Sequence, residues 1–170
     1  WCKGGARVVE RGQQMPEKVA KSRFRGRSEH ALDEKGRLNI PARFREVLQR
    51  DYTEILMVTN WHKGLKAYPV SEWQELEDIL LSQDASKAGL PSGFVRYVIS
   101  GVVECPLDKQ GRIQLPSSLR AEFGLNKDVV LNGMLNNFEI WDKGAWQDET
   151  RRTRDKFEVF VPGLESLGIR

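Results

Sequence analysis

The sequence predicts an α+β fold in which one unit of strands and helices occurs twice. Residues 31–45 read ALDEKGRLNIPARFR and residues 106–120 read PLDKQGRIQLPSSLR, so both contain Leu-Asp-x-x-Gly-Arg followed by alternating residues and a proline. The likeness continues beyond these segments, with aromatic positions in register. The corresponding pairs are Leu65 with Phe138, Tyr68 with Trp141, and Trp73 with Trp146. A copy of about 50 residues buries too little apolar surface to be stable alone, so we expect the two copies to share one core about a pseudo-two-fold axis.

The first half of each copy is expected to form a strand, a tight turn, a second strand and a helix. In the first copy a strand ends at Leu32-Asp33, and Gly36 allows the turn a positive φ. The segment Arg37–Ile40 alternates polar and apolar residues, as a half-buried strand does. Pro41 suits the first position of a helix over Pro41–Leu48. The residues expected to be buried are Phe44, Val47 and Leu48, and the matching helix from Pro116 is expected to bury Leu119 and Phe123 and to end at Gly124.

Two further strands and a second helix complete each copy. The strands are expected at Glu54–Thr59 and Lys66–Tyr68, with counterparts at Asp128–Leu131 and Asn137–Trp141. Ser71 and Gln74 have the spacing of a capping box at the start of the helix. Its apolar face holds Trp73, Leu76, Ile79 and Leu80, and the counterpart helix after Asp142 has Trp146 on its apolar side.

The chain is expected to divide into five segments. Residues 24–81 and 94–153 are the two repeats, and the second repeat opens with a strand over 94–103. Residues 82–93 are rich in small residues, Pro and Gly, as a linker is. Residues 1–23 show no periodicity and are expected to form a disordered extension. The tail, 154–170, carries an apolar cluster that packs either on its own core or on a neighbouring subunit, formed by Phe157, Val159, Phe160 and Val161.

Composition points to a soluble protein without a metal or cofactor. Charged residues make up 30% of the chain, and no segment approaches the roughly 20 apolar residues that a membrane span needs. Two cysteines do not make a disulfide framework, and the first 27 residues lack the apolar region of a signal peptide. We therefore expect a cytoplasmic location. His30 and His62 lack partners at metal-ligand spacing, and no glycine-rich phosphate loop or nucleophile–base arrangement is present, so neither a metal site nor an enzyme is expected.

Positive charge is concentrated at the N-terminal side of a chain whose net charge is only +3. Residues 1–50 hold 13 Lys and Arg against 6 Asp and Glu, residues 51–105 hold 4 against 8, and residues 106–170 hold 10 of each. A localised basic region is typical of proteins that bind a polyanion, although a solvated basic leader has the same composition.

The Asp-x-x-Gly-Arg turns suggest how such a polyanion would be recognised. Asp33 can accept backbone N–H groups across its turn and pair with the Arg37 guanidinium, and Asp108 can do the same for Arg112. A clamped arginine at a hairpin tip matches O6 and N7 of guanine in the major groove, and Lys35 and Lys109 could reach phosphates. The alternative is that both pairs are local salt bridges that only stabilise hairpins.

The same residues carry a resemblance to a known family. Residues 24–37, FRGRSEHALDEKGR, resemble the N-terminus of the MraZ family, and so do residues 105–112, CPLDKQGR, and residues 138–141, FEIW. The resemblance covers about residues 24–150. It implies two tandem swapped-hairpin, AbrB-like repeats that form a pseudo-two-fold β-barrel with flanking helices. The family's paired Asp-x-x-x-Arg motif lies on Asp33 with Arg37 and on Asp108 with Arg112.

The resemblance also implies a function. Members of the family are bacterial DNA-binding regulators that repress the division and cell-wall gene cluster in which they are encoded. They assemble into rings and bind short G-rich direct repeats of double-stranded DNA in their own promoter, which implies a nucleoid-associated, cytoplasmic protein. The first turn is the favoured base reader because Arg23, Arg25 and Arg27 precede it. The predicted DNA-binding residues are Arg25, Arg27, Asp33, Lys35, Gly36, Arg37, Asp108, Lys109, Gly111 and Arg112.

Other assignments remain open for parts of the chain. Residues 1–23 could be a basic arm that reaches DNA. The whole protein could be an antitoxin-like module that holds a protein partner through its apolar tail, or an enzyme on a related barrel. Cys105 is expected to be a small buried residue. The tryptophans Trp61, Trp73, Trp141 and Trp146 are expected in the core, with base stacking as the alternative.

Overall fold

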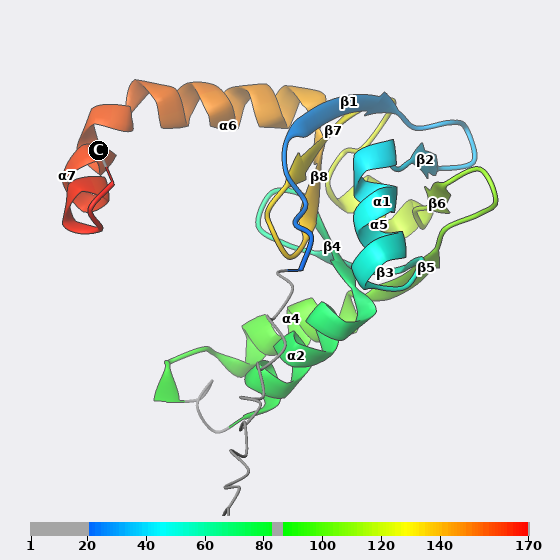
Figure 1. The fold of residues 1–170 in the computed structure, drawn as a ribbon, viewed down its shortest axis with the longest axis horizontal. Helices are drawn as coiled ribbons and strands as arrows, with labels where there is room; N and C mark the ends of the chain where they lie inside the picture. The colour runs from blue at the N-terminus through cyan, green and yellow to red at the C-terminus, as the bar shows by residue number, and fades with distance from the viewer. Residues whose placement is uncertain (1–20, 83–86, 170) are drawn as a thin grey trace, which may run out of the picture.

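Strand pairing joins the two sequence copies into one six-stranded antiparallel sheet (Figure 1). The computed structural model describes residues 21–82 and 87–169. Along the sheet the strands are β1 (Arg27–Ala31), β7 (Asp128–Gly133), β8 (Phe138–Asp142), β4 (Leu65–Pro69), β3 (Ile55–Asn60) and β5 (Val103–Pro106). Two shorter strands, β2 (Arg37–Asn39) and β6 (Arg112–Gln114), form a separate two-stranded ribbon.

The two copies exchange their first strands. β1 of the first copy pairs with β7 of the second, with Arg27 opposite Asn132 and Ala31 opposite Asp128. In the same way β5 of the second copy pairs with β3 of the first. The ribbon also joins the copies, because Leu38 of β2 lies opposite Ile113 of β6. Neither copy therefore completes a sheet by itself.

A closed barrel is not present among the strands that the structure describes, which corrects one expectation. β1 and β5 are the two edges of the six-stranded sheet and do not pair with each other. After each edge strand the chain turns sharply and enters the ribbon, so the hydrogen-bonded ladder is interrupted at both edges. The α+β class and the mostly antiparallel pairing agree with the prediction.

One hydrophobic core lies between the sheet, the ribbon and two short helices, and both copies contribute to it, as predicted. Phe44 packs against Phe24 and Phe138 with ring centroids 5.4 and 5.0 Å apart. Each such side chain stabilises the fold by about 1.5–3 kcal/mol when fully buried. Other fully buried members come from every part of the repeat and include Leu38, Leu48, Leu56, Leu65, Ile113, Leu115, Leu131 and Ile140.

The helices after the ribbon strands match the prediction closely. α1 (Ala42–Asp51) follows Pro41 and buries Phe44, Val47 and Leu48, while α5 (Ser117–Glu122) follows Pro116 and buries Leu119. Gly124 has a φ of 60° just beyond α5, the left-handed conformation expected where a helix ends. Phe123 is only partly buried, although it packs against the core.

The predicted strand over 94–103 is wrong for most of its length. Ser92–Ser100 forms helix α4, and only β5, from Val103 onward, is a strand. Phe, Tyr, Val and Ile favour strands, but Pro91 sets the start of a helix, and the helix buries Val98 against Tyr68, Trp73 and Leu80. Tertiary packing thus overrides local propensity here.

The second helix of the first copy, α2 (Val70–Leu81), differs in detail from the prediction. It begins directly after Pro69 with no side-chain cap, so the capping box predicted from Ser71 and Gln74 is wrong. Trp73 and Leu80 are buried as expected, but Ile79 is 61% exposed.

The second copy ends in an arm of two helices that leaves the body of the molecule (Figure 1). α6 (Lys143–Asp155) begins at Asp142, whose carboxylate accepts the backbone N–H of Ala145 at 3.0 Å. α7 (Phe157–Ser166) follows after Lys156. Neither helix has a buried residue, so the apolar tail does not cover the core of its own chain.

The predicted disordered extension and part of the predicted linker, residues 1–20 and 83–86, lie outside the described residues. Lys21 forms an ion pair with the buried Glu72 at 3.2 Å, and the backbone N–H of Ser22 donates to Asp51 at 2.5 Å. Among the described residues no helix is long and apolar enough to cross a membrane. The same residues contain no group of three or more His, Cys, Asp or Glu side chains that could hold a metal ion.

Candidate nucleic-acid interface

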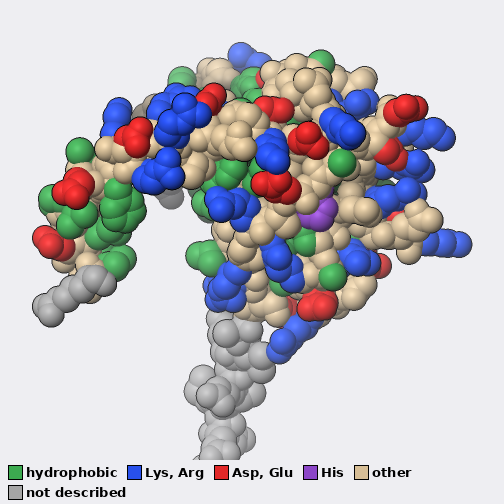
Figure 2. Space-filling model, turned by 90° about the horizontal axis from the view of Figure 1, so that it is seen from above, with side chains coloured by type: hydrophobic (Ala, Val, Ile, Leu, Met, Phe, Trp, Pro, Cys, Tyr) green, Lys and Arg blue, Asp and Glu red, His purple; other side chains and the backbone are tan. Residues whose placement is uncertain are grey.

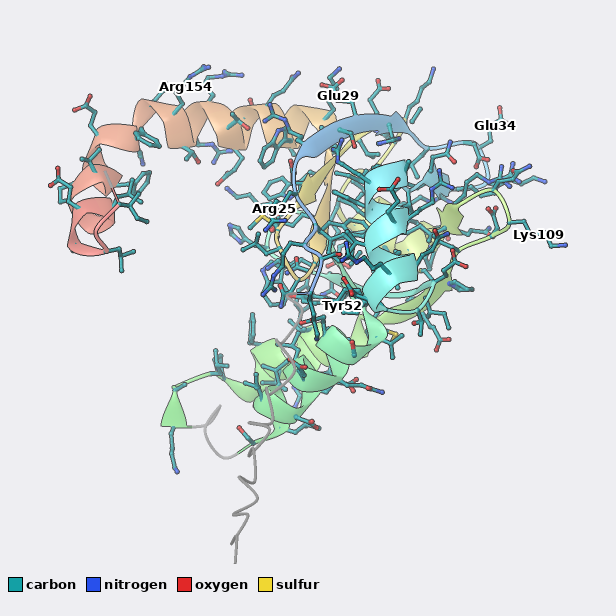
Figure 3. All side chains as sticks on the ribbon, in the orientation of Figure 1. Arg25, Glu29, Glu34, Tyr52, Lys109 and Arg154 are labelled. Carbon is teal, nitrogen blue, oxygen red and sulfur yellow. The ribbon has the colours of Figure 1, made fainter. Side chains whose placement is uncertain are left out.

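The two Asp-x-x-Gly-Arg turns lie side by side at one end of the molecule. In Figure 3 their tips, marked by Glu34 and Lys109, point outward at the end opposite the arm. Backbone hydrogen bonds tie each turn to the other copy: Ile40 N–H donates to Gly111 O at 3.0 Å, and Leu115 N–H donates to Gly36 O at 2.9 Å. The two tips are therefore held at a fixed separation by the ribbon.

The first turn is organised by one carboxylate. Asp33 Oδ1 accepts the backbone N–H groups of Lys35 at 3.0 Å and Arg37 at 2.9 Å. Its Oδ2 accepts Nε of the Arg37 guanidinium at 2.5 Å. The backbone closes the turn, since Gly36 N–H donates to Asp33 O at 2.9 Å and Asp33 N–H donates to Arg37 O at 3.1 Å. The Arg37 side chain is thereby fixed near the tip through its Nε. Its two terminal guanidinium nitrogens can donate hydrogen bonds to a ligand.

The second turn repeats this arrangement almost atom for atom. Asp108 Oδ1 accepts the backbone N–H groups of Gln110 at 2.9 Å and Arg112 at 3.0 Å, and Oδ2 accepts Arg112 Nε at 2.8 Å. A terminal guanidinium nitrogen of Arg112 also lies 2.8 Å from Oδ2. Both predicted Asp–Arg pairs are thus present, and as exposed ion pairs they contribute little to stability.

These contacts lower the pKa of both carboxyl groups. The Arg37 backbone N–H is the main cause of the lowered pKa of Asp33, with the guanidinium of the same residue adding to it. The Arg112 backbone N–H acts first in the same way on the pKa of Asp108. Both aspartates are therefore ionised at neutral pH, and the clamp on each arginine is intact.

Two further arginines support the turns and were not among the predicted site residues. Gly36 and Gly111 each have a φ of 74°, and the side chain of Arg120 packs against Gly36 while that of Arg45 packs against Gly111. Arg120 also donates from Nε to Leu115 O at 3.2 Å. The sequence repeat could have indicated both residues, because Arg45 and Arg120 occupy the last matching position of the repeated segment.

The arginines of both turns line one depression of about 460 Å³. Arg37 comes from the first copy, whereas Asp108 and Arg112 come from the second. Cys105 lies in its wall and is buried as predicted, and burial raises the pKa of its thiol to about 11. A thiol with that pKa remains protonated at neutral pH and is a poor nucleophile.

The predicted site residues separate into two groups in space. Lys35 and Lys109 are exposed on the turns beside Gly36, Arg37, Gly111 and Arg112. Arg27 lies at the far end of β1, where its guanidinium stacks on Trp146 with 5.7 Å to the ring centroid. Arg25, labelled in Figure 3, also lies away from the tips. The structure therefore does not bring Arg25 and Arg27 to the turns.

Figure 2 shows Lys and Arg side chains gathered at the end of the molecule that the turns form. Each tip carries a lysine and an arginine, and the supporting arginine of the other copy lies behind it. A rigid, paired and basic end of this kind can contact a regular array of phosphates or base edges.

Comparison with known proteins identifies the family. The model of the family described as "MraZ protein, putative antitoxin-like" matches residues 23–89 and 98–159. The chain belongs to the MraZ family. The two matched segments each contain one of the clamped turns, so the family match covers both halves of the site.

Curated relatives agree with this assignment over nearly their whole length. A protein of Syntrophobacter fumaroxidans named "Transcriptional regulator MraZ" is 41% identical over 152 residues, which are 89% of this chain and 100% of that protein. Proteins of the same name from Desulforapulum autotrophicum and Pediococcus pentosaceus are 41% and 40% identical, each over 86% of this chain and 99% of their own length.

Proposed function

We propose that this protein is a sequence-specific DNA-binding transcriptional regulator that reads bases with the clamped arginines of its two turns. The observation that carries the proposal is the pair of turns, in which Asp33 and Asp108 hold Arg37 and Arg112 at neighbouring tips. Relatives of the family bear the name of a transcriptional regulator, which supports the same function.

The shape of the tip fits the major groove of B-DNA. That groove is about 12 Å wide and admits a two-stranded β-ribbon, and an arginine fork pairs with O6 and N7 of guanine. β2 and β6 form such a ribbon, and because it is antiparallel, Arg37 and Arg112, each the first residue of its strand, lie at its two ends. Because Nε of each arginine is held by an aspartate, less side-chain entropy is lost when the guanidinium binds a base.

We extend the proposal to the target and the assembly. The protein represses the division and cell-wall gene cluster that encodes it, by binding G-rich direct repeats in its own promoter as an oligomeric ring. One arginine–guanine pair gives only about 1–3 kcal/mol of discrimination, so a single subunit selects its site weakly. Several subunits on regularly spaced repeats gain affinity through effective concentration.

Both turns are proposed to contact DNA. The sequence favoured the first turn because basic residues precede it, but Arg27 is separated from that turn by the length of β1, roughly 17 Å for an extended segment of five residues. Exposure of the side chain still favours Arg37, which is 34% exposed, over Arg112, which is 24% exposed. We expect Arg37 to contribute more than Arg112.

Arginine replacement tests the proposal directly. Arg37→Ala should weaken binding to the upstream DNA of the protein's own gene by about 10- to 100-fold, which corresponds to the loss of one bidentate base contact. The measurement is a fluorescence-anisotropy titration at fixed salt, with Arg50→Ala, an exposed arginine at the end of α1, as the matched control.

Two outcomes would overturn the proposal. The first is an Arg37→Ala, Arg112→Ala double variant that binds the specific DNA as tightly as wild type. The second is an affinity that does not fall as salt rises, because any protein that neutralises phosphates releases counterions on binding. A circular dichroism spectrum and a thermal transition unchanged from wild type show that the variant is folded.

A further inference from the structure

The helices that follow the sheet are packed differently in the two halves. In the first half α4 lies on β3 and α2, where Val98 joins a buried cluster with Tyr68, Trp73 and Leu80. In the second half α6 corresponds to α2, but the next helix, α7, bends away at the far end of α6 and does not cover β7 (Figure 1). The corresponding face of the second half therefore has no covering helix among the described residues.

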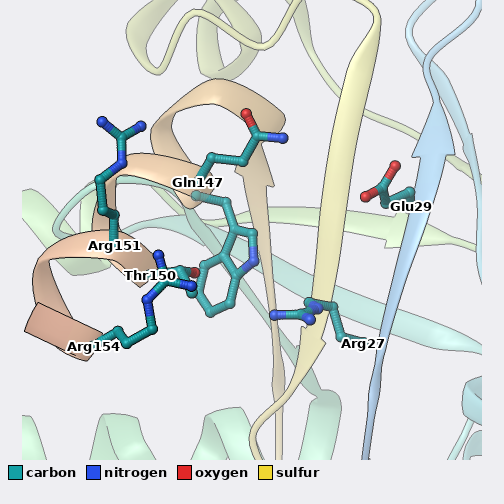
Figure 4. Close-up of a pocket in the computed structure, with 7 residues that line it drawn as sticks. Arg27, Glu29, Gln147, Thr150, Arg151 and Arg154 are labelled. Atoms are coloured by element: carbon teal, nitrogen blue, oxygen red, sulfur yellow. The ribbon is translucent and has the colours of Figure 1, made fainter. Parts of the chain in front are cut away.

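That face is the Trp146 groove, which we define as two adjoining depressions of about 360 and 270 Å³ that share Trp146, Thr150 and Arg154. Trp146 is the counterpart of Trp73, yet it is only half-buried whereas Trp73 is 1% exposed. Figure 4 shows Arg27 of β1 and Arg154 of α6 reaching into the groove from opposite sides, with Thr150 between them.

Unsatisfied polar groups mark the same face. In the first half, Thr59 on β3 donates from its hydroxyl to the carbonyl oxygen of Val98 in α4 at 2.7 Å. The registers of the two hairpins place Asn132 on β7 at the position of Thr59 on β3. Asn132 is 6% exposed, and its Nδ2 has no hydrogen-bond partner in the described structure.

Asn132 also lies opposite Arg27, a residue of the groove, and cross-strand partners share a face of the sheet. The hydroxyl oxygen of Thr150, inside the groove, is likewise buried without a partner among the described residues. A buried donor left without a partner costs about 1–3 kcal/mol, so a helix that offered carbonyl oxygens here would be stabilised.

α7 has the side chains that this face requires. α4 covers Trp73 with Val98, against which Val95 and Ile99 pack, and α7 offers an apolar stripe of its own, in which Phe157, Phe160 and Val161 follow the spacing i, i+3, i+4. Yet Phe157 is 54% exposed and Phe160 is 48% exposed. An isolated helix of this length is marginal in water, so α7 needs a partner surface to be stable.

The connection to α6 lets only the start of α7, at Phe157, reach the groove of its own chain. Residues 82–91 connect α2 to α4, which allows α4 to fold back beside α2. Only Lys156 connects α6 to α7, and a helix needs a loop of at least about two residues to reverse on its predecessor. The first half can cover itself, whereas in the second half only the first residue of α7, Phe157, lines the groove and the rest of that helix lies away from it.

We propose that α7 of one copy docks into the Trp146 groove of a second copy, in the position that α4 occupies in the first half. Charge favours this pairing, because α7 carries Glu158 and Glu165 and no Lys or Arg, while the groove carries Arg27, Arg151 and Arg154. The two acidic residues of the groove are each paired with a lysine, Glu29 with Lys143 at 2.8 Å and Glu149 with Lys63 at 2.7 Å.

The contact is heterologous, because a helix of one copy enters a groove on the next, and repetition of such a contact gives a ring or an open chain. The inference therefore rests on the self-assembly in the proposed function and identifies its interface. It does not depend on the DNA contact, because the turns lie at the other end of the molecule (Figure 1).

A charge introduced into α7 tests the docking. Phe160→Asp should convert the assembled protein to monomers in analytical ultracentrifugation, with its circular dichroism spectrum retained. Val159→Asp is the matched control, since Val159 is 74% exposed and lies on the opposite side of α7 from Phe160 and Val161. We expect the control to assemble like wild type.

Cysteine pairs then locate the contact and distinguish the occupants. In a Cys2→Ser background, chains with Thr150→Cys are mixed with differently tagged chains carrying Val161→Cys and are oxidised. A disulfide between the two tags, absent when Phe160→Asp is also present, supports docking between copies. A disulfide within monomers of the double-cysteine chain would overturn the proposal in favour of docking within one chain.

Three results would contradict the proposal outright. The first is a monomeric wild-type protein, and the second is a Phe160→Asp variant that assembles like wild type. The third is a groove that is emptied only when residues 1–20 are removed, which would make that segment the occupant. An Arg37→Ala variant separates the two proposals, because it should lose specific DNA binding and keep the disulfide between copies.

Discussion

The two clamped turns have the same geometry but unequal surroundings. Gly36 and Gly111 share a φ of 74°, and each aspartate accepts two backbone N–H groups and the Nε of its arginine. Of the three atoms nearest to a Cβ built on Gly36, however, one is the Leu115 carbonyl oxygen, whereas all three nearest to a Cβ on Gly111 belong to the Arg45 side chain. A repeated motif can thus preserve the chemistry of a site while the atoms packed behind each copy differ.

The glycines should give the largest difference between the turns. A Cβ on Gly36 would lie 2.8 Å from the Leu115 carbonyl oxygen and 2.6 Å from Arg120 Nε, while one on Gly111 would lie 2.5 Å from Arg45 Cδ. The positive φ alone costs about 1–2 kcal/mol for a residue with a side chain. We expect Gly36→Ala to lower the free energy of unfolding by about 2–4 kcal/mol and Gly111→Ala by about 1–2 kcal/mol, because the Arg45 side chain can move.

Urea denaturation measures both effects, and Gly124→Ala is the control. Gly124 also has a positive φ, of 60°, but a Cβ there would meet nothing within 4 Å. Its loss should therefore match the conformational cost alone. Equal destabilisation by Gly36→Ala and Gly111→Ala would contradict the idea that the backbone behind the first turn is the stricter constraint.

Removal of the aspartate charge should have a smaller effect, seen in DNA binding. In Asp33→Asn and Asp108→Asn the side chain can still accept backbone N–H groups, but it no longer pairs with a guanidinium. We expect the affinity for the promoter DNA to fall by about threefold to tenfold, and to fall more for Asp33→Asn because Arg37 is the more exposed arginine.

Anisotropy titrations of the two variants provide the measurement, with Asp148→Asn as the control, since Asp148 pairs with Arg151 on α6. A tighter complex in either turn variant, because negative charge has been removed near phosphate, would show that the aspartates oppose binding instead of organising the arginines.

The smallest expected effect is the response of the turns to acid. Because the pKa of Asp33 and of Asp108 is lowered on folding, their contribution to stability is present above the ordinary value of 3.8 and is lost as pH falls below it. From pH 8 to pH 5 the turns should therefore contribute a constant amount.

The measurement is the difference in stability between wild type and the Asp33→Asn, Asp108→Asn double variant as a function of pH. This difference should be flat above about pH 5 and should shrink below about pH 4. A difference that changed around pH 6 to 7 would assign the pH dependence to another group, such as His30, whose pKa is lowered by burial.

Local patterns predicted the turns well because their chemistry is contained within five residues. Asp33, Gly36 and Arg37 are close in sequence, so the hydrogen bonds of the turn follow from residue type and spacing alone. The starts of the helices after Pro41 and Pro116 could likewise be predicted from local sequence, since proline fixes its own backbone φ angle.

Features that depend on residues distant in the sequence could not be predicted from local patterns. The strand-favouring composition of residues 94–103 gave no sign that a helix was needed there to cover Trp73. Arg27 precedes the first turn in sequence, yet it stacks on Trp146 because β1 pairs with β7 of the other copy. The position of such a residue is decided by strand exchange, which adjacency in the sequence does not reveal.

Strand exchange also determines how the chain can fold. β1 meets β7 through pairs such as Arg27 with Asn132, roughly 100 residues apart along the chain, so the sheet forms only after a long loop has closed. During synthesis the first copy leaves the ribosome with β3 unpaired on the side that β5 later occupies. The nascent half therefore exposes a strand edge until the second copy is made, and an unpaired edge of this kind is a template for pairing with another chain.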